Sequence, residues 1–405
     1  MATTQQQPQT PQTPLKVGPA SAAGPVGPEQ VRRALDLVDA GTTEMATEVL
    51  EVPLSYYRDA ELEERERAAC RLTPMALASS AQVAKAHDFV VRDVLGTSVL
   101  ITRGGDGVVR AFVNYCRHRG GKPAQGCGSA RRFTCPYHAW TYDDRGALVG
   151  VPGAAGFEGL DRGGLGLVSL PCEERHGLVW VVLTAGAPID VATHLGGLDA
   201  ELGAWGLGAG EYLTERELEA AVNWKAVIEA FAENYHFPYV HSGSIVGQNT
   251  VGNTATYQEY GLHHRLGFPN PWIEGARGLG EPDISSPLDY MVFIYWIYPN
   301  LTLAMSPVGT EIIDILPGPT LGTTVLRHGW MASTPAADEA AREGYQALYE
   351  LVHAAVRDED FAVLRGCGEG GRAAQHSHMV IGRNEIGVQH VVRTFAEQFG
   401  VELGR

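Results

Sequence analysis

Short β-branched and aromatic runs alternate with turn residues between about residues 86 and 182. Runs of this length bounded by glycine are typical of antiparallel strands, and the turn at 104–107 is a clear example of such a boundary. The runs are Phe89–Val91, Ser98–Ile101, Val108–Phe112, Leu148–Val149, Leu167–Val168 and Leu178–Val182. The pattern predicts a small antiparallel β unit.

The apolar spacing becomes helical on either side of this unit. Val31, Leu35 and Val38 recur at helical spacing at the start of the segment 28–69. Thr214–Phe237 is the longest helical candidate, and Gly196–Gly210 before it looks like a connection. Strands return at 291–316, which includes the apolar run Val292–Tyr298. A second unit with both helix and sheet is therefore expected.

The first 27 residues are rich in Gln, Pro, Thr, Ala and Gly. Such a segment buries too little apolar surface to offset ordering, so we expect disorder in 1–27. It lacks a charged start followed by an apolar core, so it does not read as a secretory signal. No run approaches the roughly 18 apolar residues that a membrane span needs. We expect a cytoplasmic protein.

The 405 residues are enough for a large core and two domains. The chain carries 47 acidic and 31 basic residues, and the net charge of −16 argues against nucleic acid or an anionic membrane as a partner. An acidic surface would suit a basic redox partner, although a solvated face is the commoner explanation.

Two short loops each carry one cysteine and one histidine: Cys116 with His118, and Cys135 with His138. Two thiolates and two imidazoles suit a structural zinc or a [2Fe–2S] cluster with mixed ligands. Zinc fingers usually have both cysteines in one knuckle, so this spacing favours the cluster, with the cysteines on one iron and the histidines on the other. We interpret the remaining cysteines as free thiols in a reducing compartment; these are Cys70, Cys127, Cys172 and Cys367. Cys127 lies between the two ligand loops.

The motif continues beyond the ligands, as Cys135-Pro-Tyr-His-Ala-Trp-Thr-Tyr142. It resembles the Rieske domain of the non-heme iron, ring-hydroxylating oxygenases. Ala139 stands where that family usually has glycine, and we expect the methyl group to be tolerated.

A second metal site is predicted around residue 236. On one helix Glu229, Glu233 and His236 would share a stripe, and Pro238 would break the helix so that His241 returns beside His236. Two histidines with one carboxylate form the facial triad of non-heme Fe(II) oxygenases. The carboxylate must come from elsewhere in the chain. The candidate is Asp360, in a stretch that resembles the family's late Glu-Asp pair; Asp358 is the fallback.

The resemblance covers about residues 50–395. Asn223-Trp-Lys225 followed by Glu and His-x4-His resembles the family's catalytic-helix signature, and Gly382-Arg-Asn-Glu385 also matches many members. It implies an α+β fold: a small antiparallel β Rieske [2Fe–2S] domain (70–183) and a helix-grip catalytic domain (184–405), in which a curved antiparallel sheet surrounds a long helix. The segment 28–69 would be a helical lead-in packed on the catalytic domain.

The family also implies a role for Glu233, where its members carry an acidic residue. That residue bridges a cluster histidine of one subunit to an iron-ligand histidine of the next. The substrate-pocket candidates flank the ligands; they are Glu229, Ala230, Phe237 and Val240. The remaining histidines lack a spaced partner set, and we interpret each as a surface residue or a support to other groups; they are His87, His176, His194, His263, His264, His328, His353, His376, His378 and His390.

The expected function is that of the oxygenase component of a multicomponent Rieske system. An NAD(P)H-dependent reductase, with or without a ferredoxin, would supply electrons through the [2Fe–2S] cluster to a mononuclear Fe(II) that activates O2. The substrate would be a small organic molecule, aromatic by family default, that is mono- or cis-dihydroxylated. O- or N-demethylation is the alternative. The family implies a homotrimer; a β subunit is left open. Two rivals belong to other classes: a Rieske electron carrier, and a hydrolase with zinc at the second site.

Overall fold

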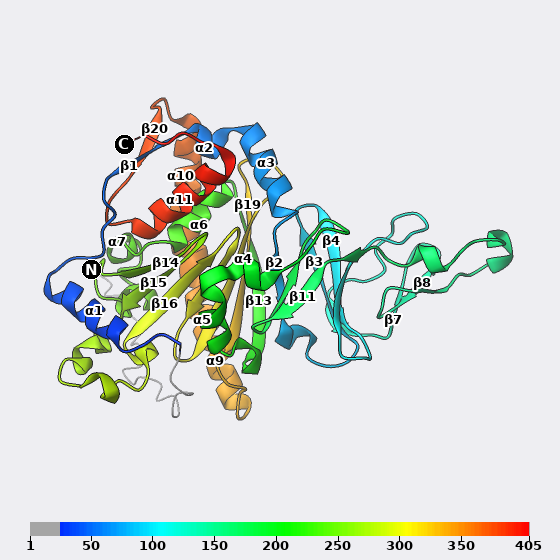
Figure 1. Ribbon diagram of the computed structural model, residues 1–405, viewed down its shortest axis with the longest axis horizontal. Helices are drawn as coiled ribbons and strands as arrows, with labels where there is room; N and C mark the ends of the chain where they lie inside the picture. The colour runs from blue at the N-terminus through cyan, green and yellow to red at the C-terminus, as the bar shows by residue number, and fades with distance from the viewer. Residues whose placement is uncertain (1–24, 405) are drawn as a thin grey trace, which may run out of the picture.

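The computed structural model describes residues 25–404. The chain forms a large part of sheet and helices and a smaller, all-β part that extends from one side of it (Figure 1). The predicted disordered tail falls almost wholly on residues 1–24, outside the described residues.

The smaller part is built from three antiparallel sheets, with strand orders β10-β5-β4-β3-β6, β11-β12-β2 and β7-β8-β9. This confirms the predicted small β unit, although Leu167–Val168 precedes a strand and does not form one. The strands are β2 (Met75–Ser79), β3 (Asp88–Val94), β4 (Thr97–Arg103), β5 (Val109–Val113), β6 (Cys127–Ser129), β7 (Arg132–Thr134), β8 (Thr141–Asp143), β9 (Leu148–Gly150), β10 (Ser169–Leu170), β11 (Cys172–Arg175) and β12 (Leu178–Val181).

The larger part contains a seven-stranded antiparallel sheet of order β13-β19-β18-β17-β16-β15-β14. The predicted strands in 291–316 are confirmed as β16, β17 and most of β18. The sheet strands are β13 (Glu211–Ala220), β14 (Thr256–Tyr260), β15 (His263–Pro269), β16 (Met291–Ile297), β17 (Leu301–Met305), β18 (Gly309–Pro317) and β19 (Thr324–Ala332).

Helices cover both faces of this sheet because its side chains alternate between two buried faces. On one face Trp296 packs with Phe395, and the helices are α6 (Trp224–Phe231), α9 (Glu339–Ala355), α10 (Phe361–Ala373) and α11 (Ile386–Phe399). On the other face Phe293 and Tyr295 pack beneath α1 (Glu29–Asp39), α4 (Val191–Leu195) and α5 (Asp199–Ala204). The short helices α7 (Phe237–Val240) and α8 (Ile245–Gln248) follow α6.

The segment before the β unit is only partly helical. Between α1 and the pair α2 (Ser55–Arg58) and α3 (Ala60–Cys70), the chain runs extended and forms β1 (Leu50–Pro53), which pairs with β20 (His378–Ile381). Val31 and Leu35 are buried as the helical spacing predicted. The segment packs on the larger part, since Val52 and Tyr56 belong to the same core as Trp224.

The predicted helix over 214–237 is wrong for most of its length. Residues 211–220 form the edge strand β13, and α6 begins only at Trp224. The glutamates of this stretch, with Arg216, favour a helix in isolation, but pairing with β19 along the strand overrides that propensity. The charged side chains suit an edge strand, whose outer side faces water.

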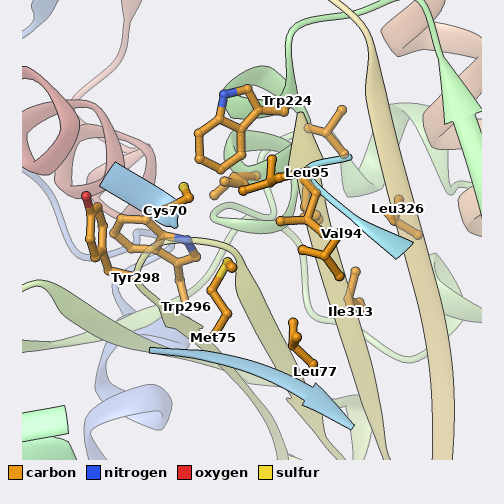
Figure 2. Packing of buried hydrophobic residues seen from close by; sticks show 14 of the residues in the cluster. Cys70, Met75, Leu77, Val94, Leu95, Trp224, Trp296, Tyr298, Ile313 and Leu326 are labelled. Carbon is orange, nitrogen blue, oxygen red and sulfur yellow. The ribbon is translucent and has the colours of Figure 1, made fainter. Parts of the chain in front are cut away.

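The two parts share one hydrophobic core. Met75, Leu77 and Val94 of the β unit pack in the same cluster as Trp224 and Leu326 of the larger part (Figure 2). Arg92 adds a polar link, since its two terminal nitrogens donate to Glu215 at 2.7 and 2.8 Å. An apolar interface of this kind opposes movement of one part against the other.

Within the described part of the chain, no helix combines the length and the apolar character that crossing a bilayer requires.

Candidate metal centres

The structure brings the two cysteine–histidine loops together at the end of the β unit. The loop after β5 carries Cys116 and His118, and the loop between β7 and β8 carries Cys135 and His138. The rings of His118 and His138 lie 4.6 Å apart between centroids, and both cysteines are buried. The loops therefore face each other with the thiols inward and the imidazoles toward the outside.

Neighbouring groups hold both loops in place. The hydroxyl of Tyr142 donates to Cys116 Sγ at 3.2 Å and accepts from the Arg117 amide at 2.9 Å. The ring of His118 stacks on Trp140 at 5.0 Å. A Cβ on Gly121 would approach Cys135 Sγ to 2.9 Å. Glycine therefore allows the backbone of the first loop to pass close to the Cys135 thiol, where any side chain would clash with the sulfur.

Ala139 has a left-handed backbone, with φ of 55°. Its amide donates to the carbonyl of Cys135, which closes the turn behind the second ligand loop. A methyl group in this conformation carries a strain of about 1 kcal/mol. The alanine therefore fits the turn at a small cost in stability that glycine would avoid.

The second cluster forms on the sheet face that α6 covers. α6 ends at Phe231, and His236 precedes the short helix α7. Pro238 lies in the first turn of α7, where its missing amide hydrogen is not needed. It begins a helix, contrary to the expected helix break. The result for the ligands is nevertheless the expected one, because the rings of His236 and His241 lie 5.1 Å apart.

Asp360 reaches these histidines from a distant segment. It ends a π-helical turn, η9 (Val356–Asp360), between α9 and α10. Its Oδ1 lies 3.3 Å from His236 Nε2 and 3.1 Å from His241 Nε2. Asp358, the fallback, instead pairs with Arg357 and is largely exposed. Among the described residues, His236, His241 and Asp360 are the one group of three or more such side chains whose ligand atoms converge tightly enough to hold a metal ion.

Each imidazole has a further carboxylate on its other nitrogen. Glu233 Oε1 bonds to His236 Nδ1, and Glu359 Oε2 lies 2.5 Å from His241 Nδ1. Such carboxylates fix the ring orientation and tautomer and leave each Nε2 for a metal. Sequence reasoning missed Glu359. The available signal was its place directly before Asp360, with no indication of which histidine it meets.

The electrostatics of the site favour a cation. Burial lowers the pKa of His236, but hydrogen bonds to Asp360 and Glu233 outweigh it and raise the pKa to about 9. Burial raises the pKa of Asp360, and its bonds to both histidines more than offset this and lower it. The carboxylates therefore stabilise positive charge where the ligand atoms converge.

The predicted pocket residues are placed in different surroundings. Phe237 packs against the rings of both His236 and His241 and against Phe268. Glu229 turns toward α2, where the hydroxyl of Tyr57 donates to its Oε2 at 2.8 Å. Ala230 packs on the main core, and Val240 is half-buried on α7. Phe237 is thus the pocket candidate that packs directly against the histidines.

Several histidines that sequence reasoning interpreted as surface or supporting groups are core residues. His263, His264, His328 and His353 are all at most 2% exposed. They escaped prediction because the sequence gives no sign of which long-range neighbours bury them.

Two family models match separate stretches of the chain. The model of the Rieske [2Fe–2S] domain matches residues 73–167, and that of the ring hydroxylating alpha subunit (catalytic domain) matches residues 209–400. Together they take in more than two thirds of the sequence. The chain belongs to the alpha (oxygenase) subunit family of Rieske oxygenases. Members of this family use a Rieske [2Fe–2S] cluster, a mononuclear iron and O2, and the chain is an O2-dependent oxidoreductase of this type.

Relatives of this oxygenase include both monooxygenases and dioxygenases. The carnitine monooxygenase oxygenase subunit of Escherichia coli (strain K12) is 26% identical over 86% of the chain and 93% of the relative. The biphenyl 2,3-dioxygenase subunit alpha of Rhodococcus jostii (strain RHA1) is 34% identical, over 38% of the chain and 35% of the relative. The crystal structure of a quaternary ammonium Rieske monooxygenase with L-carnitine superposes with a TM-score of 0.74 at 21% identity, covering 88% of this chain and 96% of that one. This last likeness confirms the expected fold.

The residues present fit both metal groups. Two buried thiols opposite two imidazoles are the donor set of a Rieske cluster. Two Nε2 atoms and one carboxylate oxygen, with both Nδ1 atoms already bonded, suit a mononuclear iron that keeps open positions.

Proposed function

We propose that this protein is the terminal oxygenase of a Rieske monooxygenase system that acts on a small quaternary ammonium compound. The convergence of His236, His241 and Asp360 carries the oxygenase chemistry. The iron held there would supply O2 activation. One oxygen atom enters a C–H bond of the substrate next to nitrogen and the other leaves as water, with two electrons and two protons consumed. The resulting N–C–OH unit separates into an amine and a carbonyl compound.

The ligand roles are part of this proposal. Cys116, His118, Cys135 and His138 would hold the [2Fe–2S] cluster, and His236, His241 and Asp360 the mononuclear iron. Glu233 and Glu359 would orient the two iron histidines. The short distances between these side chains support the roles, and they favour Asp360 over Asp358.

Two observations support a quaternary ammonium substrate: the coverage of the relatives and the side chains around the histidines. The carnitine monooxygenase subunit is matched over nearly its whole length, whereas the biphenyl dioxygenase subunit is matched over about a third. Phe237 packs against His241 and offers an aromatic ring beside the histidines, and aromatic rings attract quaternary ammonium groups. This favours the demethylation-like alternative over the aromatic default.

Hydroxylation of an aromatic substrate is the second candidate, because the matched part of the biphenyl dioxygenase subunit has the higher identity. The two functions differ in their products. Carnitine, glycine betaine and choline, together with biphenyl and benzoate, form a discriminating panel. Amine release from a quaternary compound supports the first function, and a diol from an aromatic compound supports the second.

An external electron donor is part of the proposal, and local charge indicates its character. Residues 114–142, which contain both ligand loops, carry five basic and no acidic residues in a chain of net charge −16. Four of them are exposed and form no ion pair with any described residue: Arg117, Arg119, Arg131 and Arg132. We call these four the arginine collar. It suits an acidic reductase or ferredoxin, whereas the overall charge had suggested a basic one.

A homotrimer completes the proposal. Tyr137 at the cluster end is 56% exposed, and Tyr239, close in sequence to Glu233 and His236, is 73% exposed. Large exposed aromatic side chains are enriched at protein–protein contacts. We infer that the cluster end of one subunit meets the Glu233 side of the next. Sedimentation at micromolar concentration would give a trimer mass if this is right and a monomer mass if it is wrong.

A further inference from the structure

Three polar side chains link the central sheet to the helix that leads to Asp360. His328 Nε2 on β19 lies 2.9 Å from Glu311 Oε2 on β18. His328 Nδ1 lies 3.1 Å from Nδ1 of His353 on α9. His328 is fully buried and His353 is 2% exposed. We call this set the Glu311–His328–His353 relay.

The relay is a chain of hydrogen bonds. A carboxylate oxygen accepts, so His328 Nε2 donates to Glu311. Burial and the neighbouring His328 lower the pKa of His353 to about 4, which keeps its ring neutral near pH 7. A neutral imidazole has one donor and one acceptor nitrogen, so one of the two facing Nδ1 atoms donates to the other. The contact between His328 and His353 is therefore a directional hydrogen bond.

The relay acts on the same helix that delivers Asp360. α9 runs without a break into η9 and α10, from the lower to the upper part of the molecule in Figure 1. In an uninterrupted α-helix, Asp360 would share the face of His353, seven residues earlier, and point at β19. The π turn adds one residue, which rotates the C-terminal part of the helix by about 100°. This rotation directs Asp360 toward His236 and His241.

The rotation of α9 about its own axis thus decides where the Asp360 carboxylate lies. One turn before His353, the hydroxyl of Tyr349 donates to the backbone carbonyl of His328 at 3.0 Å. Leucine side chains at these positions could fill the same space, but their contacts would not be directional. A hydrogen bond is satisfied only over a narrow range of angles, so it restricts the rotation of α9 more tightly. A buried polar pair left unsatisfied would also destabilise the fold.

We propose that the Glu311–His328–His353 relay positions Asp360 for metal binding by fixing the rotation of α9. These are positioning residues, since they touch the carboxylate only through the helix. The proposal rests on Asp360 being an iron ligand.

The test compares variants of His353 by their affinity for Fe(II) at the second site. His353→Leu removes the hydrogen-bond partner of His328 Nδ1, and His353→Asn offers a side-chain amide in its place. We expect His353→Leu to weaken Fe(II) binding about tenfold, within the range known for groups that orient metal ligands, and His353→Asn to stay within about threefold of the wild type. The EPR spectrum of the Fe(II)–nitric oxide adduct should broaden only in the leucine variant. The visible spectrum of the cluster should be unchanged in both.

A triple variant separates positioning from simple stability. Glu311→Leu, His328→Leu and His353→Leu together remove every member of the relay and leave none of them unpaired, so thermal stability should recover while Fe(II) affinity stays low. If affinity recovers together with stability, the relay is only structural and the proposal fails. Equal affinity of wild type and His353→Leu would also overturn it.

Two controls distinguish a failure of the relay from a failure of the assignment of Asp360 as an iron ligand. Leu351→Ala, at a position on α9 that is 57% exposed, should leave Fe(II) affinity unchanged. Asp360→Ala should abolish binding. If Asp360→Ala binds Fe(II) normally, the ligand assignment fails; if it loses Fe(II) while His353→Leu does not, the relay alone fails.

Discussion

Each imidazole of the proposed iron site bonds to a carboxylate through the ring nitrogen that faces away from Asp360. The arrangement is nearly symmetrical, with Glu233 on His236 and Glu359 on His241. The carboxylates make the Nε2 atoms better ligands and prevent the rings from turning.

Glu359→Ala should therefore lower Fe(II) affinity by about 10- to 100-fold and leave the cluster intact. Titration of Fe(II) into protein freed of its second iron measures this directly. Asp358→Asn is the matched control one residue earlier, since Asp358 is exposed and paired with Arg357. Loss of iron in Asp358→Asn with normal binding in Glu359→Ala would contradict the geometry.

Ala139→Gly should stabilise the cluster loop by about 1 kcal/mol, because glycine adopts the left-handed conformation without strain. Thermal bleaching of the cluster absorbance would shift upward. Ala130→Gly makes the same chemical change where the backbone is not left-handed, and it should lower the bleaching temperature. A downward shift in both variants would show that Ala139 is not strained.

Sequence reasoning at this scale grouped the candidate ligands as the structure does, because the candidates within each loop lie close together in the chain. His236 and His241 come from one segment, and the Glu-Asp pair carried a family resemblance. Glu359 contacts a histidine 118 positions away, and His353 on α9 contacts His328 on β19. Neither contact leaves a local pattern, so neither could be inferred from spacing.

The beginning of α6 explains the Asn-Trp-Lys signature at the level of whole elements. Asn223 caps the helix by accepting from the Lys225 amide at 3.0 Å, and its side chain donates to the Tyr57 carbonyl at 3.0 Å. Lys225 pairs with Glu66 of α3, with both side chains 1% exposed. The signature thus anchors the helix that precedes His236 and His241 against the lead-in helices.

Lys225→Met should destabilise the fold by about 3–5 kcal/mol, because it leaves the Glu66 carboxylate buried and unpaired. Removing both charges, with Glu66→Leu and Lys225→Met together, should cost less than the single change. Urea unfolding of the double variant and of both single variants, Lys225→Met and Glu66→Leu, beside the wild type measures the differences. If the loss of stability in the double variant equals the sum of the losses in the two single variants, Lys225 and Glu66 are not coupled.

The elements that sequence reasoning misassigned were those governed by distant partners. Residues 211–220 contain good helix formers, yet they pair with β19 as an edge strand. Five strands of the β unit were found because turn residues bound their apolar runs; they are β3, β4, β5, β9 and β12. The remaining strands of the unit have two to five residues and were missed. The π turn at Val356–Asp360 has no sequence signal that we recognised.

At the scale of the whole molecule, the local charge at the cluster end has the opposite sign to the net charge of the chain. The chain is acidic, but the end that carries the cluster loops has a collar of four exposed arginines that pair with no described carboxylate. Like charges left uncompensated around a redox centre raise the rate of encounter with a partner of opposite sign.

Reversal of two collar charges, with Arg131→Glu and Arg132→Glu together, should slow cluster reduction by an acidic ferredoxin about tenfold at low salt. The wild-type rate should fall as NaCl rises, and the variant should lose most of that dependence. Stopped-flow absorbance at the cluster band measures the reaction. Arg372→Glu, an exposed arginine on α10, and reduction by an uncharged photoreduced flavin serve as controls. A wild-type rate that rises with salt would mean that the donor is basic.

The central claim concerns what this oxygenase does with O2, and a single turnover under 18O2 tests it most directly. Protein with reduced cluster and loaded iron would be mixed with 18O2 and each compound of the panel, and quenched into borohydride to trap carbonyl products. The account predicts one labelled oxygen in the trapped product and one amine released per O2 from a quaternary ammonium compound, both lost in His236→Ala with the cluster intact. Two labelled oxygens in a diol from an aromatic compound, with no amine from any quaternary compound, would contradict it.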